Sequence, residues 1–398
     1  MLVYENSEQA IQAGECWQSF GGLSLVLANR FGVGEFNVRF ASNALAGSSN
    51  LGLQWRFIMR WRSGFGIVAC WLALTIAPAL AQESKLEVGN GERLLVLAPH
   101  PDDESLSSAG LIQRVFAKGG SVRAVVVTSG DAYVDAVKMD TGKSRLSPAD
   151  YLAFGEKRLD ESRRAAQILG GGFLHLDLMG FSDGAIYAAL VSHWRRNSPF
   201  RSRFTGFDHV PYRDSLDWGN AQDGKDLVGE LVATMKETKP TIISFPDVME
   251  DDSDHAGLGM FALLAVHEWR AQTQNERIDP KMLAYLVHWP HWPKGSDWGI
   301  AQDWSNEPMH LPDNLPARGH RRICLDLTQA EIARKHDAIA QYLTQQRIMA
   351  DFLASFVRSS ECFTQLAPTN ANRIEAVIEH WQQARKAFNS HPLDRRKI

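Results

Sequence analysis

The sequence predicts an α/β fold: a Rossmann-like, mostly parallel sheet with helices on both faces and long loop insertions. Short apolar runs alternate with segments of helical spacing from residue 93 onward. Glycine tracts end two of the helical segments. Two long stretches without apolar periodicity, 187–222 and 288–320, interrupt the alternation. Loops of that length are uncommon inside a compact domain and tend to be functional.

The first predicted unit is a strand, a turn, a helix and a second strand. Residues 93–98 contain a continuous apolar run, which is typical of a buried parallel strand. A polar turn covers 100–104, and 105–118 has helical spacing that stops at Gly119-Gly120. The valine-rich segment 122–128 is the second strand. The whole unit takes about 35 residues, the length of a βαβ motif.

The later segments continue this alternation and predict a sheet covered by helices on both faces. We expect helices over 150–169, 226–236, 256–272 and 328–356, and strands over 173–178, 241–245, 282–288 and 322–327.

Residues 59–81 have the three-part anatomy of a secretory signal peptide. Met59-Arg-Trp-Arg62 is positively charged, 63–78 is uncharged and largely apolar, and Ala79-Leu-Ala81 is a small-x-small cleavage pattern. The apolar run is short for a membrane span, which needs about 20 residues. We therefore expect cleavage after Ala81, with an uncleaved signal anchor as the alternative.

A signal peptide that begins at residue 59 makes the preceding segment anomalous. We interpret 1–58 as a non-native upstream extension, with translation starting at Met59, or else as a genuine disordered extension. Residues 82–398 are then one domain, and the protein is periplasmic or secreted. Cys324 and Cys362 remain after cleavage; in an oxidising compartment they could form a disulfide, and two buried free thiols are the alternative.

Composition and charge exclude some partner classes. The chain is 44% hydrophobic and 22% charged, which is ordinary for a globular protein. Its formal net charge of -4 comes without any basic block, which argues against a nucleic-acid partner. No stable membrane span is expected after signal cleavage.

Two polar clusters follow predicted parallel strands, where ligands bind in such sheets. His100 and Asp103 lie on a turn stiffened by Pro101, and His255 follows the fourth strand. Two imidazoles and one carboxylate are a common open zinc set. Asp102 is placed to take a proton from water beside the metal. The alternative is that these acidic residues only cap a helix.

The first cluster, Ala98-Pro-His-Pro-Asp-Asp-Glu104, resembles the signature of the PIG-L (LmbE-like) zinc-dependent N-deacetylases. The resemblance spans roughly 93 to 363. Further segments resemble the family in the same order: Thr128-Ser-Gly-Asp131, Arg158-Leu-Asp-Glu161, Leu178 to Gly184, Asp254-His255 and Lys335 to Gln345.

The resemblance implies roles for individual residues. His100, Asp103 and His255 would be the ligands of Zn²⁺, and Asp102 the general base. Arg158 and Asp183 resemble positions that contact the sugar in family members; the alternatives are a structural ion pair for Arg158 and a turn residue for Asp183.

One position departs from the family. The family usually reads His-x-Asp-His, and its leading histidine helps to stabilise the oxyanion, whereas this chain reads Asp252-Ser-Asp-His255. An ionised aspartate cannot donate a hydrogen bond to an oxyanion. Another donor is needed for full activity, and the loop candidates are His209, Tyr133, Tyr212 and Arg213.

The resemblance implies a secreted zinc-dependent hydrolase that removes an N-acetyl group from an N-acetylated amino sugar or glycoconjugate. Two alternatives remain: a non-catalytic, zinc-containing carbohydrate-binding protein, and an amidase that acts on a non-sugar amide. Four tryptophans in the second long insertion could stack on sugar faces or serve as packing residues: Trp289, Trp292, Trp298 and Trp304.

Overall fold

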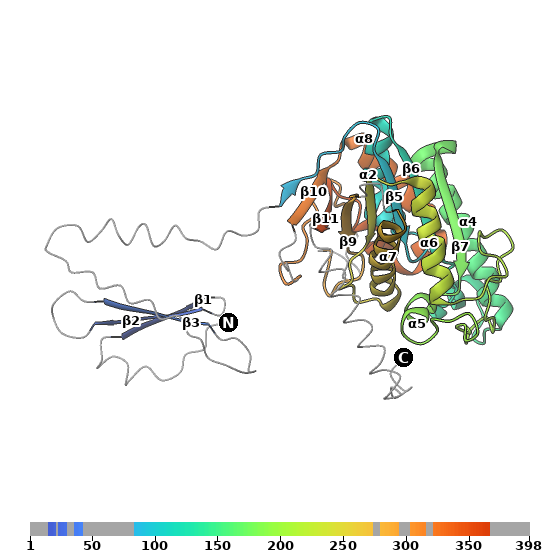
Figure 1. Cartoon of the computed structure of the whole chain (residues 1–398), viewed down its shortest axis with the longest axis horizontal. Helices are drawn as coiled ribbons and strands as arrows, with labels where there is room; N and C mark the ends of the chain where they lie inside the picture. Colours follow the sequence, from blue (N-terminus) through green and yellow to red (C-terminus); the bar gives the residue numbers. More distant parts are fainter. Residues whose placement is uncertain are drawn as a thin grey trace. The chain divides into compact units, whose positions relative to one another are not determined.

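The computed structural model describes residues 15–20, 23–29, 36–42, 83–273, 279–293, 303–315 and 321–366. The chain divides into two compact units, Met1–Leu80 and Ala81–Ile398 (Figure 1).

In the first unit, three strands form an antiparallel sheet in the order β1-β2-β3. Their bounds are β1 Glu15–Phe20, β2 Leu23–Asn29 and β3 Phe36–Ser42. The sequence-based interpretation of 1–58 assigned no strand to this segment. That 1–58 is a non-native extension stays a prediction, and the predicted signal peptide over 59–81 lies outside the described residues.

The second unit is built on one eight-stranded sheet in the order β4-β10-β11-β9-β8-β5-β6-β7. The strands are β4 Ser84–Lys85, β5 Arg93–Ala98, β6 Ser121–Thr128, β7 Leu174–Phe181, β8 Ile242–Pro246, β9 Lys281–Tyr285, β10 Arg321–Asp326 and β11 Ser360–Leu366. β9, β8, β5, β6 and β7 run parallel to one another. β11 is antiparallel to both β9 and β10, and β4 runs parallel to β10. The predicted, mostly parallel sheet is therefore confirmed.

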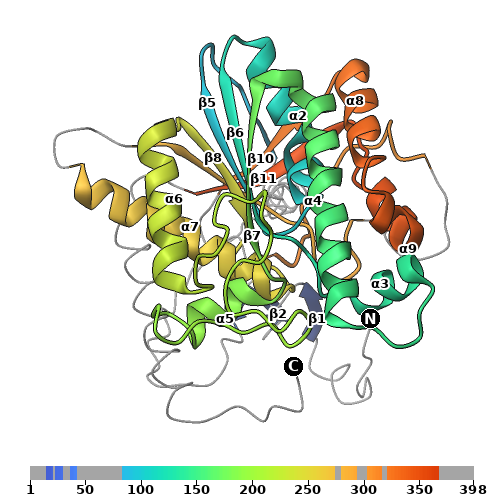
Figure 2. The same cartoon turned by 90° about the vertical axis from the view of Figure 1, so that its right-hand side faces the viewer.

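Helices cover both faces of this sheet, as predicted (Figure 2). The helices are α2 Asp103–Ala117, α3 Val134–Thr141, α4 Pro148–Gly170, α5 Ala185–Val191, α6 Gly224–Thr238, α7 Ser253–Gln272, α8 Gln329–Ile339 and α9 Leu343–Ala354, with a 3-10 turn at Gly171–Phe173. Alternate residues of β5 enter two cores. Leu94 and Val96 pack in the core that includes α2 and α8, and Leu95 and Leu97 in the core that includes α6 and α7.

The predicted closing helix over 328–356 is wrong, because two helices occupy this segment. α8 ends before Ala340, and α9 begins at Leu343. Between them the fully buried Tyr342 donates a hydrogen bond to the carboxylate of Glu104. That long-range contact turns the chain inward, and local helical spacing does not encode it. The sequence also did not predict β11, α3 or α5, and α5 overlaps the start of the expected insertion 187–222.

Cys324 and Cys362 form a disulfide, one of the two alternatives that the sequence left open. The two residues are directly opposite each other on the antiparallel strands β10 and β11. The bond therefore links two strands that are neighbours in the sheet but 38 residues apart in the chain.

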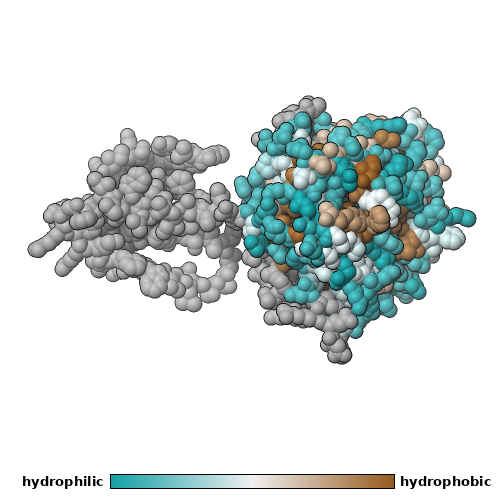
Figure 3. All heavy atoms as spheres, turned by 90° about the horizontal axis from the view of Figure 1, so that it is seen from above, coloured by the Kyte–Doolittle hydropathy of each residue, from teal (hydrophilic) through white to brown (hydrophobic). Residues whose placement is uncertain are grey.

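The surface in Figure 3 is mainly hydrophilic, with hydrophobic residues in scattered groups. Few large apolar side chains are exposed in the described part of the chain; the most exposed is Phe173, at 85%. Among the described helices, none combines the length and the apolar character needed to cross a bilayer.

Candidate metal centre

The turn after β5 places three acidic side chains at the start of α2. Asp103 and Glu104 are the first residues of that helix, and Asp102 precedes them with a φ of 120°. A non-glycine residue in this region costs on the order of 1–3 kcal/mol, and such strain concentrates at functional sites. The turn is held by the backbone N–H of His100, which donates to Asp103 Oδ2 at 2.9 Å, and by that of Ser105, which donates to the Asp102 carbonyl at 2.9 Å.

Three side-chain atoms from two strand ends converge beside this turn. His255, the third residue of α7, brings its Nε2 to 3.2 Å from Asp103 Oδ2 and 3.3 Å from His100 Nδ1. His100 Nδ1 is 3.4 Å from the same Asp103 oxygen. The sequence predicted these three residues as one ligand set, and the fold brings them together.

The size of this triangle is that of a metal site. In a tetrahedral site with metal–ligand bonds of 2.0–2.1 Å, neighbouring ligand atoms are about 3.3–3.4 Å apart. The three measured edges, 3.2, 3.3 and 3.4 Å, match one face of such a tetrahedron. A metal held by these three atoms would have its fourth position left for water or substrate. His100, Asp103 and His255 can therefore hold a divalent metal ion in an open site.

The charges around the triangle favour a bound cation. Burial favours the neutral imidazole of His255, yet the carboxylates of Asp103 and Glu250 raise its pKa to about 10. Although burial opposes it, His255 and His100 lower the pKa of Asp103 well below its usual range. Carboxylates held next to imidazoles thus stabilise positive charge at this point, which either a proton or a metal ion can supply.

Glu250 supports His255 from behind, and the sequence did not single it out. Its Oε1 lies 3.5 Å from His255 Nδ1, on the side of the ring away from the triangle. The same carboxylate accepts the backbone N–H groups of Val287 and His288. A carboxylate on the second nitrogen of a ligating histidine orients the ring and makes it a better ligand. Glu250 lies in an acidic loop, where nothing in the local sequence separates it from its neighbours.

Asp183 has the corresponding position behind His100. Its Oδ1 lies 3.4 Å from His100 Nε2, and Asp254 Oδ2 is 3.8 Å from the same nitrogen. Asp254 is anchored because it accepts the backbone N–H groups of Gly184 and Tyr187. Asp183 is therefore more than a turn residue: it orients a candidate ligand and also lines the pocket.

Arg158 holds Asp102 in place. Its guanidinium donates to Asp102 Oδ2 at 3.1 Å, to the carbonyl of Pro101 at 2.7 Å and to the carbonyl of Gly130 at 2.9 Å. Gly130 has a φ of 60°, and a Cβ there would lie 2.0 Å from Arg158 Nη1, so only glycine admits this arginine. The structural ion pair that the sequence left as the alternative is present, and Arg158 also lines the pocket.

The Asp102 carboxylate is suited to accept a proton. Burial raises its pKa to about 8; the Arg158 guanidinium opposes the shift, and Asp103 and Glu104 add to it. A group with a pKa near neutrality can both take and return a proton.

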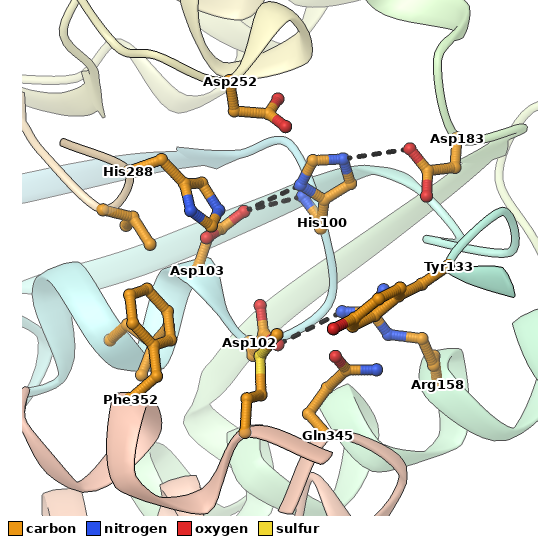
Figure 4. Close-up of a pocket in the computed structure, with 13 residues that line it drawn as sticks. His100, Asp102, Asp103, Tyr133, Arg158, Asp183, Asp252, His288, Gln345 and Phe352 are labelled. Carbon is orange, nitrogen blue, oxygen red and sulfur yellow. Dashed lines mark hydrogen bonds and ion pairs between the residues drawn. The ribbon is translucent and has the colours of Figure 1, made fainter. Parts of the chain in front are cut away.

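Two members of the triangle, His100 and Asp103, line a pocket of about 300 Å³, and Figure 4 shows them with Asp102 and His288. Part of the pocket lining is polar and includes Asp102, Arg158, Asp183, Tyr133 and Gln345. Leu106, Val287, Met349 and Phe352 are the apolar part of the lining. Gln345, Met349 and Phe352 come from α9, the helix that the sequence merged with α8.

The residues proposed from sequence as oxyanion donors are scattered. Only Tyr133 lines the pocket. Tyr212 is buried and donates to Asp131, and His209 is paired with Asp208. Arg213 lies over the ring of the exposed Trp218.

Asp252 caps α7, where its Oδ1 accepts the backbone N–H groups of Asp254 and His255. Another imidazole, that of His288, enters the pocket from the segment after β9.

The described tryptophans of the second insertion are packing residues. Trp289 donates to Asn314, and Trp292 is buried and donates to the carbonyl of His310. Trp304 is buried under the guanidinium of Arg358. Trp298 lies outside the described residues. Sugar stacking on Trp292 or Trp304 would require these buried rings to become exposed.

A family model described as "PIG-L: GlcNAc-PI de-N-acetylase" matches residues 95–266. Over these residues the chain is similar to the PIG-L family. The match includes the three candidate ligands, Asp102, Arg158, Asp183 and Glu250, whereas His288 and α9 lie beyond it.

Two curated relatives carry the name 1D-myo-inositol 2-acetamido-2-deoxy-alpha-D-glucopyranoside deacetylase. The protein from Mycolicibacterium smegmatis is 29% identical over 151 residues, which cover 38% of this chain and 44% of that protein. The one from Streptomyces avermitilis is 24% identical over 246 residues, 61% of this chain and 69% of that protein. The chain thus spans less than half the length of the first of these relatives.

Solved structures are also similar. N,N'-diacetylchitobiose deacetylase from Pyrococcus horikoshii aligns with 70% of this chain and 84% of its own, at 15% identity and a TM-score of 0.40. The A40926 pseudoaglycone deacetylase aligns with 71% of this chain and 100% of its own, at 17% identity and a TM-score of 0.44.

Proposed function

We propose that this protein is a zinc-dependent hydrolase that removes an N-acetyl group from an N-acetylated amino sugar or glycoconjugate. The observation that carries the proposal is the triangle of His100, Asp103 and His255, with edges of 3.2–3.4 Å, next to the Asp102 carboxylate. The match of residues 95–266 to the PIG-L family model supports it, and so do the names of the curated relatives, which are amino-sugar deacetylases.

Two imidazoles and one carboxylate are the donor set of many catalytic zinc sites. When bound, zinc would polarise the amide carbonyl and acidify the attacking water. Glu250 and Asp183 would keep His255 and His100 in the orientation that binding requires.

Asp102 takes a proton from the water molecule as the water oxygen bonds to the amide carbon. The C–N bond then breaks, and its electron pair stays on the nitrogen. Asp102 returns the proton to that nitrogen, so the products are acetate and the free amino sugar. Arg158 keeps the carboxylate at this point through its contacts with Asp102 and Pro101.

The mixed lining of the pocket fits such a substrate. Asp183, Tyr133 and Gln345 offer hydrogen-bond partners for sugar hydroxyls. Met349 and Phe352 offer apolar contact for the methyl group of the acetyl. A sugar contact by Arg158 belongs to the same proposal.

The site of action that we propose is the periplasm or the cell exterior. The signal-peptide pattern over 59–81 supports this, and so does the Cys324–Cys362 disulfide, because disulfides persist in oxidising compartments. Expression in a bacterium followed by mass analysis of the exported protein tests the proposal. We expect an N-terminus at Gln82; retention of the entire chain in the cytoplasm would contradict it.

An acetate-release screen tests the activity. The purified protein is incubated with chitooligosaccharides and N-acetylglucosaminyl glycosides, with and without a chelator, and with zinc restored after chelation. We expect acetate release that the chelator stops and zinc restores. A panel of acetylated non-sugar amides in the same screen separates an amino-sugar deacetylase from a more general amidase.

The aspartate at 252 favours a second candidate function, a zinc-containing carbohydrate-binding protein without turnover. Asp252 caps α7 and cannot donate a hydrogen bond to the reacting oxygen while ionised. Binding of chitooligosaccharides, measured by calorimetry, without acetate release across the panel would favour this function over the first.

A further inference from the structure

Hydrolysis of an amide places negative charge on the carbonyl oxygen, and a preorganised hydrogen-bond donor at that oxygen is worth a large factor in rate. Asp252 is not that donor. Its Oδ1 accepts the backbone N–H groups of Asp254 and His255, so this side chain already serves as the acceptor that caps α7.

Most other donors in the pocket are already engaged. Arg158 donates to three oxygens, those of Asp102, Pro101 and Gly130. Both ring nitrogens of His100 face partners: Nδ1 faces His255 Nε2, and Nε2 faces Asp183 Oδ1. Figure 4 shows Tyr133 and Gln345 beside Arg158, whereas His288 lies beside Asp103.

His288 has a ring nitrogen close to the metal triangle. One of its nitrogens lies within 4.8 Å of ligand atoms of both Asp103 and His255. Its ring centroid is 4.7 Å from that of His255, in an edge-to-face arrangement. Among the residues that the structure describes, none makes a hydrogen bond to either ring nitrogen of His288.

The position of His288 is fixed from three sides. Its backbone N–H donates to Glu250 Oε2 at 2.7 Å, and its carbonyl accepts the N–H of Asp251 at 3.0 Å. Its ring stacks on Phe352, with centroids 5.6 Å apart and planes 5° from parallel. Because Glu250 also faces His255, a single carboxylate ties this histidine to a candidate metal ligand.

We propose that His288 donates the hydrogen bond to the carbonyl oxygen of the amide that is cleaved. The inference rests on the proposed function. A neutral imidazole carries one N–H, so the role needs no proton transfer. The segment after β9 thus supplies the imidazole that the start of α7 lacks.

The test compares His288→Ala with wild type and with His175→Ala, which removes an exposed histidine paired with Asp177. The full chain is loaded with zinc for kinetics and with cobalt(II) for visible spectra. In His288→Ala we expect kcat to fall about 10²-fold to 10³-fold with little change in KM. Metal stoichiometry and the cobalt spectrum without acetate should match wild type, and His175→Ala should behave as wild type throughout.

Acetate binding to the cobalt protein is a readout that is independent of turnover. Acetate is the expected product and carries the oxygen that was the reacting carbonyl oxygen, so His288→Ala should weaken its binding roughly tenfold or more. Unchanged acetate affinity, with kcat within threefold of wild type, would overturn the proposal. Loss of metal or a changed acetate-free cobalt spectrum would also overturn it, because His288 would then be a ligand.

The two proposals can fail separately. If wild type releases no acetate from any substrate, the proposed function fails, while the acetate titration of the cobalt protein still shows whether His288 donates to the oxygen of a bound acetyl group. If wild type is active and His288→Ala matches it in kcat and acetate affinity, only the role of His288 fails.

Discussion

The two halves of the eight-stranded sheet differ in the side chains at their strand ends and in the interactions that stabilise them. The parallel half, β9-β8-β5-β6-β7, ends in polar side chains that are buried, close together and in part strained, as at Asp102. The antiparallel end, where β11 pairs with β10 and β9, carries the disulfide and the buried pair of Lys335 and Glu361. The parallel half carries the candidate metal site, and the antiparallel end carries interactions that stabilise the sheet.

The antiparallel end also contacts α2, the helix that begins at Asp103 in the turn after β5. Glu361 accepts the backbone N–H groups of Gly110 and Leu111 in the middle of α2, and Lys335 donates to the carbonyl of Leu106. The ion pair thus ties segment 106–111 of α2 to both β11 and α8. The comparison teaches that changes in the parallel half should act on activity, and changes in the antiparallel end on stability.

The largest effect should follow removal of a candidate ligand. His255→Ala breaks two of the three edges of the triangle, so we expect loss of the metal and a fall of acetate release to the background level. Metal analysis and the acetate assay measure this, and far-UV circular dichroism checks the fold. Full occupancy by one zinc per chain in the variant would show that the triangle is not the metal site.

Asp102→Asn should reduce kcat by about 10²-fold to 10⁴-fold, because the amide cannot take the proton from water. The zinc content should remain one ion per chain, and the melting temperature should stay close to that of wild type. The exposed Asp135→Asn is the matched control and should have no effect. If Asp102→Asn deacetylates normally with zinc bound, Asp102 is not the general base.

In the antiparallel end, Lys335→Met should lower the free energy of unfolding by about 3–5 kcal/mol, since it leaves the buried Glu361 carboxylate without its cation. Urea denaturation measures the loss, and kcat of the folded protein should change little. The double variant with Glu361→Gln should recover part of the stability, because no unpaired charge is then buried. A large loss of kcat in the stable double variant would contradict the division between the halves.

Removal of the disulfide should have the smallest effect. Cys324→Ala with Cys362→Ala should cost about 2–4 kcal/mol of stability through the freedom that the unfolded chain regains. The urea midpoint of this variant should not respond to a reducing agent, whereas that of wild type should fall toward it. Equal midpoints in oxidised wild type and the variant would mean that the sheet pairing alone secures this end.

The sequence by itself determined the parallel half. Continuous apolar runs predicted β5, β6, β7, β8 and β9 to within a few residues, because parallel strands that are buried on both faces have apolar side chains on both sides. The local turn from His100 to Asp103 was also readable, since its members are adjacent in the chain. His255 was assigned to the same site because it follows another parallel strand, and such sheets bind ligands at the carboxyl ends of their strands.

Other features of the fold and of the site were decided by tertiary structure alone. β11, the break before Tyr342 and the positions of Glu250 and His288 depend on contacts between segments far apart in the chain. His209 and Tyr212 were reasonable donors by residue type, but the loop that carries them turns their side chains onto Asp208 and Asp131. Local periodicity specifies an element and its buried face. The order of the strands and the paths of the loops decide which side chains come within 3–4 Å of one another. Local sequence propensity encodes neither the strand order nor the loop paths.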